Sequence, residues 1–386
     1  MRILIALTYY RPHVSGLSIY AERLARGLAR HGHTVTVLTS RFHPSLPARE
    51  RRDGVDVIRV PVATKVSKGV IMPTFPVYAA HLVRQHDVVN IHMPQFESAL
   101  LALLGRGFGK GVVVTYQCDL KLPVGAFNRL VQWSLRPLNH LAARLAHRVV
   151  VTTEDYAQHS SFLRRYTHKV SAIPPVIELP PADPVVTQRL AERWHFNGRP
   201  QIGFAARFAA EKGVEYLLEA LPAVIAEVPD VRVVFTGAYK DTVGEEEYFA
   251  SLQPLIQRYA DRLTFMDLLS DSEMASFFSL CDVLAVTSLN STEAFGMVQV
   301  EAMLEGTPVV ASDLPGVREA IRRTGMGEIV PPHDAAALAA ALVRVLRRRQ
   351  AYVRPRAEVV RTFDVEQAVG EYETLFADVC RPRGGA

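Results

Sequence analysis

Two cations in the second half of the chain stand where they could hold a negatively charged group. Arg207 and Lys212 lie in the segment 203–213, between a predicted strand over 201–204 and a predicted helix over 214–221. The first turn of a helix carries unpaired backbone N–H groups and the positive end of the helix dipole, and both favour an anion. Together with the two cations, this helix start predicts a site for the diphosphate of a sugar nucleotide.

Two carboxylates flank a second helix start about ninety residues further along the chain. Glu293 and Glu301 are separated by Ala-Phe-Gly-Met-Val-Gln-Val, and Gly296 within this segment predicts a turn. Glu293 then stands in the loop before the helix, and Glu301 projects from the helix about two turns later. A hydroxylated group such as a ribose could meet Glu301 there.

The composition favours a globular protein with two α/β domains. The chain has 386 residues, more than one ordinary core requires, and 49% of them are hydrophobic. No apolar run approaches the roughly 18 residues of a membrane span, and the first residues predict a buried strand rather than a signal peptide. Cys118, Cys281 and Cys380 are widely spaced and predict neither a disulfide framework nor a metal site. We therefore expect a cytoplasmic protein.

The net charge of +5 hides an asymmetry between the two halves of the chain. Residues 1–180 hold 23 Lys/Arg and 10 Asp/Glu, which gives +13, whereas residues 181–386 hold 21 and 29, which gives −8. The basic half includes four arginines along a predicted helix: Arg129, Arg136, Arg144 and Arg148. Such a surface suits an anionic membrane, with simple solvated helices as the alternative. No nucleic-acid recognition motif accompanies these charges, so no nucleic-acid partner is expected.

Strand-like and helix-like segments alternate through most of the chain, which predicts parallel sheets covered by helices. A proline-rich segment over 173–184 interrupts the alternation and predicts a linker between a domain over 1–175 and a second domain over 185–364. A final helix is expected over about 365–380. Two doubly wound domains suggest that ligands bind in a cleft between them, at the carboxyl ends of the strands.

The motifs resemble those of the family 4 glycosyltransferases, which are retaining enzymes of the GT-B fold, over nearly the whole chain. The segment 204–214 resembles the family's Gly-Arg-(four residues)-Lys-Gly element. Glu293 and Glu301 match its pair of glutamates with seven residues between them, and the segments 280–288 and 306–312 occupy the usual flanking places. The resemblance implies two Rossmann-like doubly wound α/β domains facing across a cleft, with the last helix crossing back onto the N-terminal domain.

The resemblance also implies roles for the charged residues of the donor-binding C-terminal domain. Arg207 and Lys212 would hold the donor diphosphate and stabilise the departing phosphate. Glu293 would lie beside the transferred sugar, and Glu301 would bind the ribose. Further backbone N–H donors would come from the glycine turn, namely Phe295, Gly296, Met297 and Val298. Ordinary surface charges at Arg207, Lys212 and Glu301, and a plain turn at Gly296, are the alternatives.

The acceptor-side N-terminal domain departs from the family pattern in two places. The family's loop after the first strand usually has two glycines, whereas this chain has Ser15 followed by Gly16, and His13 is the acceptor-side candidate in the same loop. Gly16 would let the backbone approach the donor, or would serve structure alone. Gln117 stands where relatives commonly have histidine, and it could hydrogen-bond a sugar but not act as a base. Asp119 would hold acceptor or sugar hydroxyls, with a helix-capping role as its alternative.

The implied reaction moves a hexosyl group from a UDP- or GDP-sugar to an acceptor hydroxyl with retention of configuration. Its catalytic candidates are Arg207, Lys212, Glu293 and Asp119. Neither an Asp-x-Asp motif nor metal-ligand spacing among the histidines appears, so no metal and no cofactor besides the sugar nucleotide are expected. The acceptor would be a glycan or a lipid-linked group in cell-envelope or exopolysaccharide assembly, reached from the cytoplasm or the inner face of the membrane.

Three alternatives to this reaction follow from the same residues. A catalytically idle protein that binds nucleotide sugars as a partner of another enzyme would fit the departures at Gln117 and Ser15. A dehydrogenase with paired Rossmann-like domains would need a Gly-x-Gly-x-x-Gly motif after the first strand, and the chain has none there. An epimerase of the GT-B type would need acid and base residues that the sequence does not identify.

Overall fold

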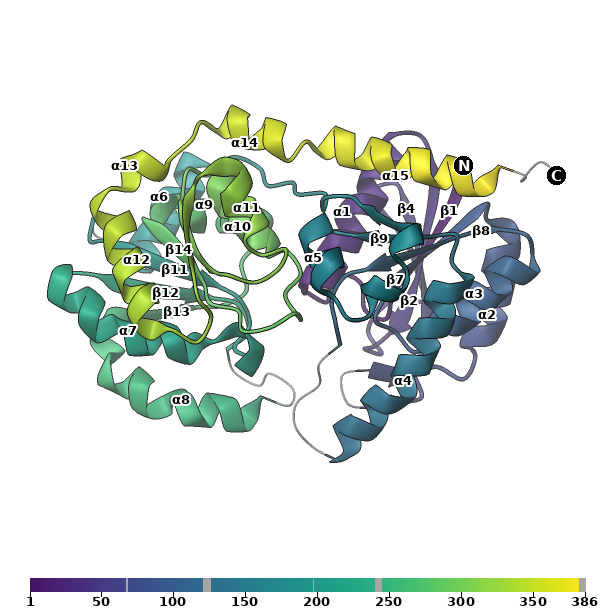
Figure 1. Cartoon of the computed structure of the whole chain (residues 1–386), viewed down its shortest axis with the longest axis horizontal. Helices are drawn as coiled ribbons and strands as arrows, with labels where there is room; N and C mark the ends of the chain where they lie inside the picture. The colour runs from purple at the N-terminus through teal and green to yellow at the C-terminus, as the bar shows by residue number, and fades with distance from the viewer. Residues whose placement is uncertain (67–68, 121–125, 197, 240–244, 382–386) are drawn as a thin grey trace. The chain divides into compact units, whose positions relative to one another are not determined.

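The computed structural model describes residues 1–66, 69–120, 126–196, 198–239 and 245–381 (Figure 1). Within helix α4, the side chains of residues 126–128 are also outside the description. The chain divides into two compact units. The first, unit 1, comprises Met1–Val176 together with Asp364–Ala386, and the second, unit 2, comprises Ile177–Phe363.

Unit 1 is built on an eight-stranded sheet with the order β10-β9-β8-β7-β1-β2-β4-β3. All neighbours are parallel except β3 and β4. The strands are β1 (Arg2–Ala6), β2 (Thr34–Arg41), β3 (Arg49–Arg52), β4 (Val55–Pro61), β7 (Val88–Met93), β8 (Gly111–Tyr116), β9 (Arg148–Val151) and β10 (Val170–Ala172). A separate hairpin joins β5 (Thr64–Val66) and β6 (Gly69–Ile71). The direction of winding reverses between β1 and β7, which makes their carboxyl ends the ligand-binding position of such a sheet.

The helices of unit 1 cover a sheet whose central strands are wholly buried, as expected for a parallel sheet covered on both faces. They are α1 (Gly16–Arg30), α2 (Phe75–Gln85), α3 (Ser98–Gly107), α4 (Ala126–Leu145), α5 (Glu154–His159) and α15 (Val365–Cys380), with short 3₁₀ turns η1 (Leu163–Arg165) and η2 (Thr167–Lys169). Ser15 and Ser18 form a reciprocal capping box that fixes the start of α1.

The C-terminal helix α15 packs on unit 1, against α1 and β8 (Figure 1). The buried Tyr372 hydroxyl lies 2.7 Å from the Tyr20 hydroxyl and 3.3 Å from the hydroxyl of Thr115. Gly27 on α1 faces Val369, and a Cβ at Gly27 would lie only 2.6 Å from a Val369 methyl carbon. The last helix is therefore an integral part of the N-terminal unit.

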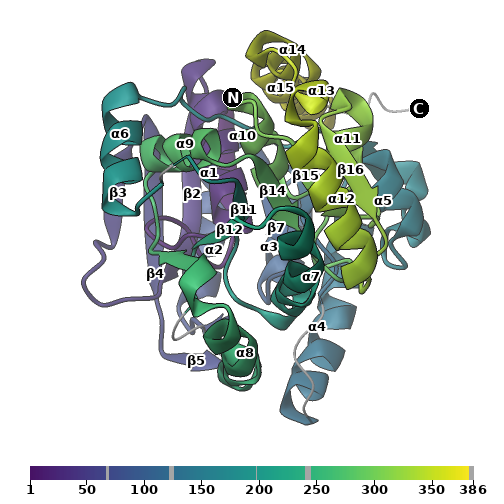
Figure 2. The same cartoon turned by 90° about the vertical axis from the view of Figure 1, so that its left-hand side faces the viewer.

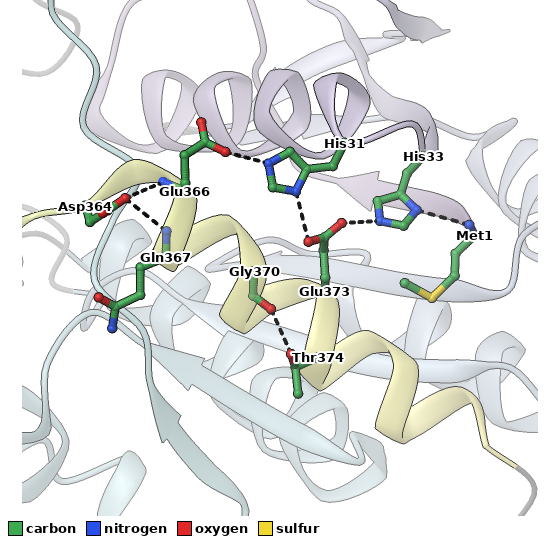
Figure 3. Close-up of polar contacts among 9 residues, drawn as sticks. All are labelled: Met1, His31, His33, Asp364, Glu366, Gln367, Gly370, Glu373 and Thr374. Atoms are coloured by element: carbon green, nitrogen blue, oxygen red, sulfur yellow. Dashed lines mark hydrogen bonds and ion pairs between the residues drawn. The ribbon is translucent and has the colours of Figure 1, made fainter.

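Two histidines at the end of α1 connect this region to two glutamates of α15 (Figure 3). The His31 ring nitrogens lie 2.6 Å from a Glu366 oxygen and 2.9 Å from a Glu373 oxygen. The other Glu373 oxygen lies 2.6 Å from His33, whose second ring nitrogen is 3.0 Å from the Met1 amino group. Hydrogen bonds to Glu373 and Glu366 raise the pKa of His31 against the opposing effect of burial.

This histidine network predicts how the stability of unit 1 depends on pH. Because folding raises the pKa of His31, the contribution of His31 to the free energy of unfolding is complete below about pH 6.5. This contribution is lost as the pH rises through the raised pKa. Burial alone would raise the pKa of Glu373, but the hydrogen bonds from His31 and His33 lower it, so its contribution is lost only in acid. We expect His31→Asn to remove about 0.5–1 kcal/mol from the free energy of unfolding near pH 6 and less as the pH rises.

Urea unfolding at several pH values tests this prediction. The matched control is His81→Asn, which changes an exposed histidine on α2. The control should keep the pH dependence of the wild type. A His31→Asn variant whose unfolding midpoint follows the wild type at every pH would contradict the expected role of His31.

Unit 2 contains a six-stranded, wholly parallel sheet with the order β13-β12-β11-β14-β15-β16. Its strands are β11 (Gln201–Ala205), β12 (Arg232–Thr236), β13 (Leu263–Met266), β14 (Val283–Val286), β15 (Val309–Ser312) and β16 (Gly327–Val330). From β11 the chain adds strands in one direction to β13, and from β14 it adds them in the opposite direction to β16. This sheet therefore also has a switch point, between the neighbouring strands β11 and β14.

Helices cover both faces of the second sheet, and each face has its own hydrophobic cluster. They are α6 (Pro184–Arg193), α7 (Val214–Glu227), α8 (Glu246–Arg258), α9 (Asp271–Leu280), α10 (Met297–Leu304), α11 (Glu319–Thr324), α12 (Ala335–Arg347), α13 (Arg349–Tyr352) and α14 (Arg356–Thr362), with the turns η3 (Ala210–Lys212) and η4 (Ala260–Arg262). The prediction of two Rossmann-like α/β domains is confirmed by these two sheets.

Candidate active site

The charged residues predicted in unit 2 come from two loops at the switch point of its sheet. The first loop follows β11 and leads into α7, and the second follows β14 and leads into α10. Because β11 and β14 are parallel neighbours, both loops leave the same edge of the sheet side by side. The topology therefore brings together residues that are about eighty positions apart in the sequence.

Lys212 and Glu293 form an ion pair that joins the two loops. Both side chains are about one-fifth exposed, at 22% and 19%. The hydroxyl of Thr287 donates to the backbone oxygens of Lys212 and Gly213, at 2.7 and 2.9 Å, and thereby fixes the first loop onto the end of β14. Ser288 donates to the same Glu293 carboxylate at 3.4 Å. Thr287 thus holds the backbone of Lys212, and Glu293 holds its side chain. Binding of a ligand would therefore need little further ordering of this lysine.

Arg207 lies in the same loop but has different partners. It pairs with Glu211 and, at 3.7 Å, with Glu245, and its side chain is 39% exposed. The Glu245 side chain is only 4% exposed and also accepts a hydrogen bond from the backbone N–H of Ala210 at 3.1 Å. Neither glutamate was predicted as a site residue. Glu211 lies four residues after Arg207 in the same loop, whereas Glu245 comes from a separate segment just before α8, which no local pattern connects to Arg207.

The start of α10 provides the backbone groups that the sequence predicted. Gly296 occupies the position before the helix with φ 74°, in the left-handed region that favours glycine, and no side chain caps this end. The first helical residues, Met297 and Val298, therefore present uncapped N–H groups of the kind that bind phosphate. Phe295 is 3% exposed, and its carbonyl accepts a hydrogen bond of 2.8 Å from Gln299. The turn role of Gly296 is confirmed and is compatible with an anion site.

Glu301 lies on α10 with only 6% of its surface exposed. A solvated helix residue would be far more accessible, so this alternative is wrong. The ribose contact itself stays a prediction.

The residues predicted in unit 1 lie around the carboxyl ends of β1 and β8. His13 stacks on Tyr9 with ring centroids 4.8 Å apart, and its carbonyl accepts a 2.7 Å hydrogen bond from Ser18. A Cβ added to Gly16 would meet nothing within 4 Å, so packing does not require a glycine there. The open backbone at Gly16 is consistent with a close ligand approach, which stays a prediction.

Gln117 is buried and donates to Nδ1 of His92 at 2.6 Å. Burial lowers the pKa of His92 to about 3, which keeps this imidazole neutral. Asp119 accepts hydrogen bonds of 2.8 Å from the hydroxyls of Tyr116 and Ser160, so its carboxylate is fixed at the end of β8. Residues 121–125 lie outside the described part of the chain, so the alternative that Asp119 caps the following helix is not tested.

Glu97 is a titratable residue of unit 1 that the sequence did not single out. It follows β7 and stands at the position just before α3, without capping that helix. Burial raises the pKa of its carboxyl to about 7. Its place near the switch point makes it a second acidic group, besides Asp119, at this edge of the sheet.

Neither a metal centre nor a membrane-spanning helix is found in the described part of the chain. Among these residues, no group of three or more His, Cys, Asp or Glu side chains is arranged to hold a metal ion. None of the described helices is both long enough and apolar enough to cross a bilayer.

Two family models together match most of the chain. The model described as glycosyl transferases group 1 matches residues 188–359, and the model described as glycosyl transferase 4-like domain matches residues 15–176. A phosphatidyl-myo-inositol mannosyltransferase of Mycobacterium leprae is 30% identical over 75% of this chain and 74% of its own length. A 2-deoxystreptamine glucosyltransferase of Streptomyces kanamyceticus is 28% identical over 86% of this chain and 89% of its own.

Solved structures agree on the fold. A sucrose-phosphate synthase from Thermosynechococcus elongatus matches with a TM-score of 0.78 at 23% identity, covering 98% of both chains. The Anabaena protein HepE, solved in complex with UDP-glucose, matches with a TM-score of 0.78 at 20% identity, covering 98% of this chain and all of its own. The sequence motifs, the two parallel sheets and these matches together show that the chain belongs to the family 4 glycosyltransferases, enzymes of the GT-B fold that act on nucleotide sugars.

Proposed function

We propose that this protein transfers a hexosyl group from a UDP- or GDP-sugar to an acceptor hydroxyl, with retention of the anomeric configuration and without a metal ion. The observation that carries the proposal is the Lys212–Glu293 pair, which joins two loops beside the uncapped start of α10. This arrangement combines a cation and backbone N–H groups for a diphosphate with a carboxylate for the sugar.

The proposed step breaks the bond between the anomeric carbon and the phosphate oxygen and forms a bond from the acceptor oxygen on the same face. The acceptor proton passes to the departing phosphate oxygen, so no side chain needs to form a covalent intermediate. Negative charge grows on the phosphate during this step, and Lys212 and Arg207 stabilise that charge more strongly in the transition state than before it. Glu293 orients the sugar, and Glu301 orients the ribose.

The acceptor is proposed to bind at the end of the unit 1 sheet, where Asp119 would hold a hydroxyl group. The relatives named as phosphatidyl-myo-inositol mannosyltransferases support a lipid-linked or glycan acceptor in cell-envelope or exopolysaccharide assembly. We place the enzyme in the cytoplasm or at the inner face of the membrane.

One observation favours a second candidate, a nucleotide-sugar-binding partner protein without turnover. Gln117 cannot take up a proton, and burial lowers the pKa of its neighbour His92 to about 3, so neither residue is an effective base at neutral pH. The proposed mechanism uses the departing phosphate instead of a protein base, and the two candidates therefore differ in whether the bound donor reacts.

A nucleotide-release assay separates the two candidates. The protein is incubated with a panel of UDP-, GDP- and ADP-sugars, with and without EDTA, and with glycan and lipid acceptors. We expect release from one UDP- or GDP-sugar that EDTA does not reduce, and a product whose anomeric configuration matches that of the donor. Donor binding with no release under any condition would favour the idle partner, and an inverted product would refute retention.

A further inference from the structure

Helix α4 of unit 1 has two apolar faces, and only one of them is covered by the protein. Val131, Leu135 and Ala142 are buried, and the helix packs against α3 and β8. On the other side, Trp133 is 76% exposed and Leu130 is 60% exposed. A surface helix of a globular protein normally shows polar groups on its outer face, so this exposed apolar face needs an explanation.

The exposed apolar residues form a continuous stripe. Trp133, Pro137 and Leu141 follow one another at intervals of four, and Leu130 precedes Trp133 by three, so all four lie on one side of the helix. The N-terminal half of α4 extends beyond the other elements of its own unit in both views (Figure 1 and Figure 2). The stripe is thus presented on a projecting helix.

The exposed side of α4 is also strongly basic. Arg129, Arg136 and Arg144 are exposed, and none of them forms an ion pair with a residue that the structure describes. The sequence contains no Asp or Glu between Asp119 and Glu154. The stripe is therefore accompanied by positive charge without any compensating negative charge on its own helix.

We propose that α4 is a docking surface for an anionic lipid bilayer. The indole of Trp133 and the side chains of Leu130 and Leu141 enter the boundary between headgroups and acyl chains, while the arginines contact the lipid phosphates. Tryptophan suits this boundary because one edge of its ring is apolar and the other carries an N–H group. A second copy of this chain is a poor occupant, because pairing two such faces would bring like charges together.

The charge requirement is tested with paired double variants. Binding is measured by co-sedimentation with vesicles of phosphatidylcholine, with or without phosphatidylglycerol. Wild type should bind only the vesicles that contain phosphatidylglycerol, and Arg129→Gln/Arg136→Gln should bind them about 30-fold more weakly. The control Arg51→Gln/Arg52→Gln makes the same change in net charge on exposed β3 and should retain binding.

The apolar contact is tested by fluorescence. The chain has two tryptophans, so Trp194→Phe leaves Trp133 as the only one. The emission of this variant should shift to shorter wavelength when anionic vesicles are added, as expected for an indole that leaves water. Leu130→Ser should weaken binding about tenfold, whereas Leu268→Ser, which changes a leucine of matching exposure in unit 2, should not.

Both tests are read without donor or acceptor, so their outcome is independent of the proposed reaction. Equal binding to neutral and anionic vesicles, or equal loss in the two arginine variants, would overturn the proposal. An emission maximum that does not move on vesicle binding would show that α4 is not the surface in contact. If the chain does not bind vesicles but associates with itself, and Trp133→Ser abolishes that association, the stripe would be a self-association surface instead.

Discussion

Replacement of Lys212 by alanine should lower kcat for sugar transfer about a hundredfold or more while leaving the protein folded. Removing one well-placed donor to a developing negative charge costs roughly 10²–10³ in kcat, and Lys212 is held in place by Glu293 and by the Thr287 contacts to its loop. The ion pair itself is partly exposed, so its loss should cost only about 1 kcal/mol of stability. The effect on catalysis should therefore greatly exceed the effect on folding.

The measurement is nucleotide release at saturating donor, with thermal unfolding followed in parallel. Lys65→Ala is the matched control, because it removes the same charge from an exposed position on β5. The control should keep the activity of the wild type. A Lys212→Ala enzyme with kcat within a few-fold of wild type would refute the assigned role of this lysine.

Alanine at Gly213 should both destabilise unit 2 and impair transfer. Gly213 has φ 62°, and an added Cβ would overlap the carbonyl oxygen of Thr287 and the side chain of Leu289. The left-handed conformation costs about 1–2 kcal/mol for a residue with a Cβ, and the overlap adds about 1–3 kcal/mol. Relief of that overlap would move the Lys212 loop away from β14, so we expect kcat to fall as well.

Two other glycines separate conformational strain from overlap. Gly198→Ala shares the positive φ, at 75°, but its Cβ would meet nothing within 4 Å, so it should cost about 1–2 kcal/mol. Gly16→Ala has neither problem and should leave stability unchanged or slightly increased. Urea unfolding should rank the variants in the order Gly213, Gly198, Gly16, from largest loss to smallest. Equal losses at Gly213 and Gly198 would show that the contact with Thr287 does not constrain the loop.

The alternation of strand-like and helix-like segments was sufficient to predict both sheets, because short, largely apolar segments such as 88–93 and 111–116 favour strands buried in a covered parallel sheet. Strand β3, with the sequence Arg-Glu-Arg-Arg, has no apolar pattern to predict it. It forms because its backbone pairs with β4 at the sheet edge and because Glu50 pairs with the buried Arg59. These partners are set by tertiary packing, which local patterns do not contain.

Helix α6 shows a different reason for a missed element. The proline-rich segment over 173–184 suggested a linker, but its last two residues, Asp183 and Pro184, are also a helix start. Asp183 accepts hydrogen bonds from the backbone N–H groups of Val185 and Val186, at 2.8 and 3.1 Å. The information was local and present in the sequence, and the proline content concealed it.

The candidate site likewise contains residues that the sequence could predict and contacts that it could not. Lys212 and Glu293 could be identified from motif spacing, because each belongs to a loop between a strand and a helix whose form is fixed locally. The contact between Arg207 and Glu245 could not, because Glu245 reaches Arg207 from a separate segment, just before α8. The pairing of Gln117 with His92 likewise depends on the neighbouring positions of β7 and β8.

Hydrogen exchange with and without nucleotide tests the central claim most directly, namely that the donor diphosphate binds between the loops after β11 and β14. On addition of UDP or GDP, we predict slower exchange of backbone amides in two segments together, 206–214 and 293–299. Protection of both segments that disappears in Lys212→Ala would support the account. Nucleotide binding that protects neither segment would contradict it and would place the donor elsewhere in the molecule.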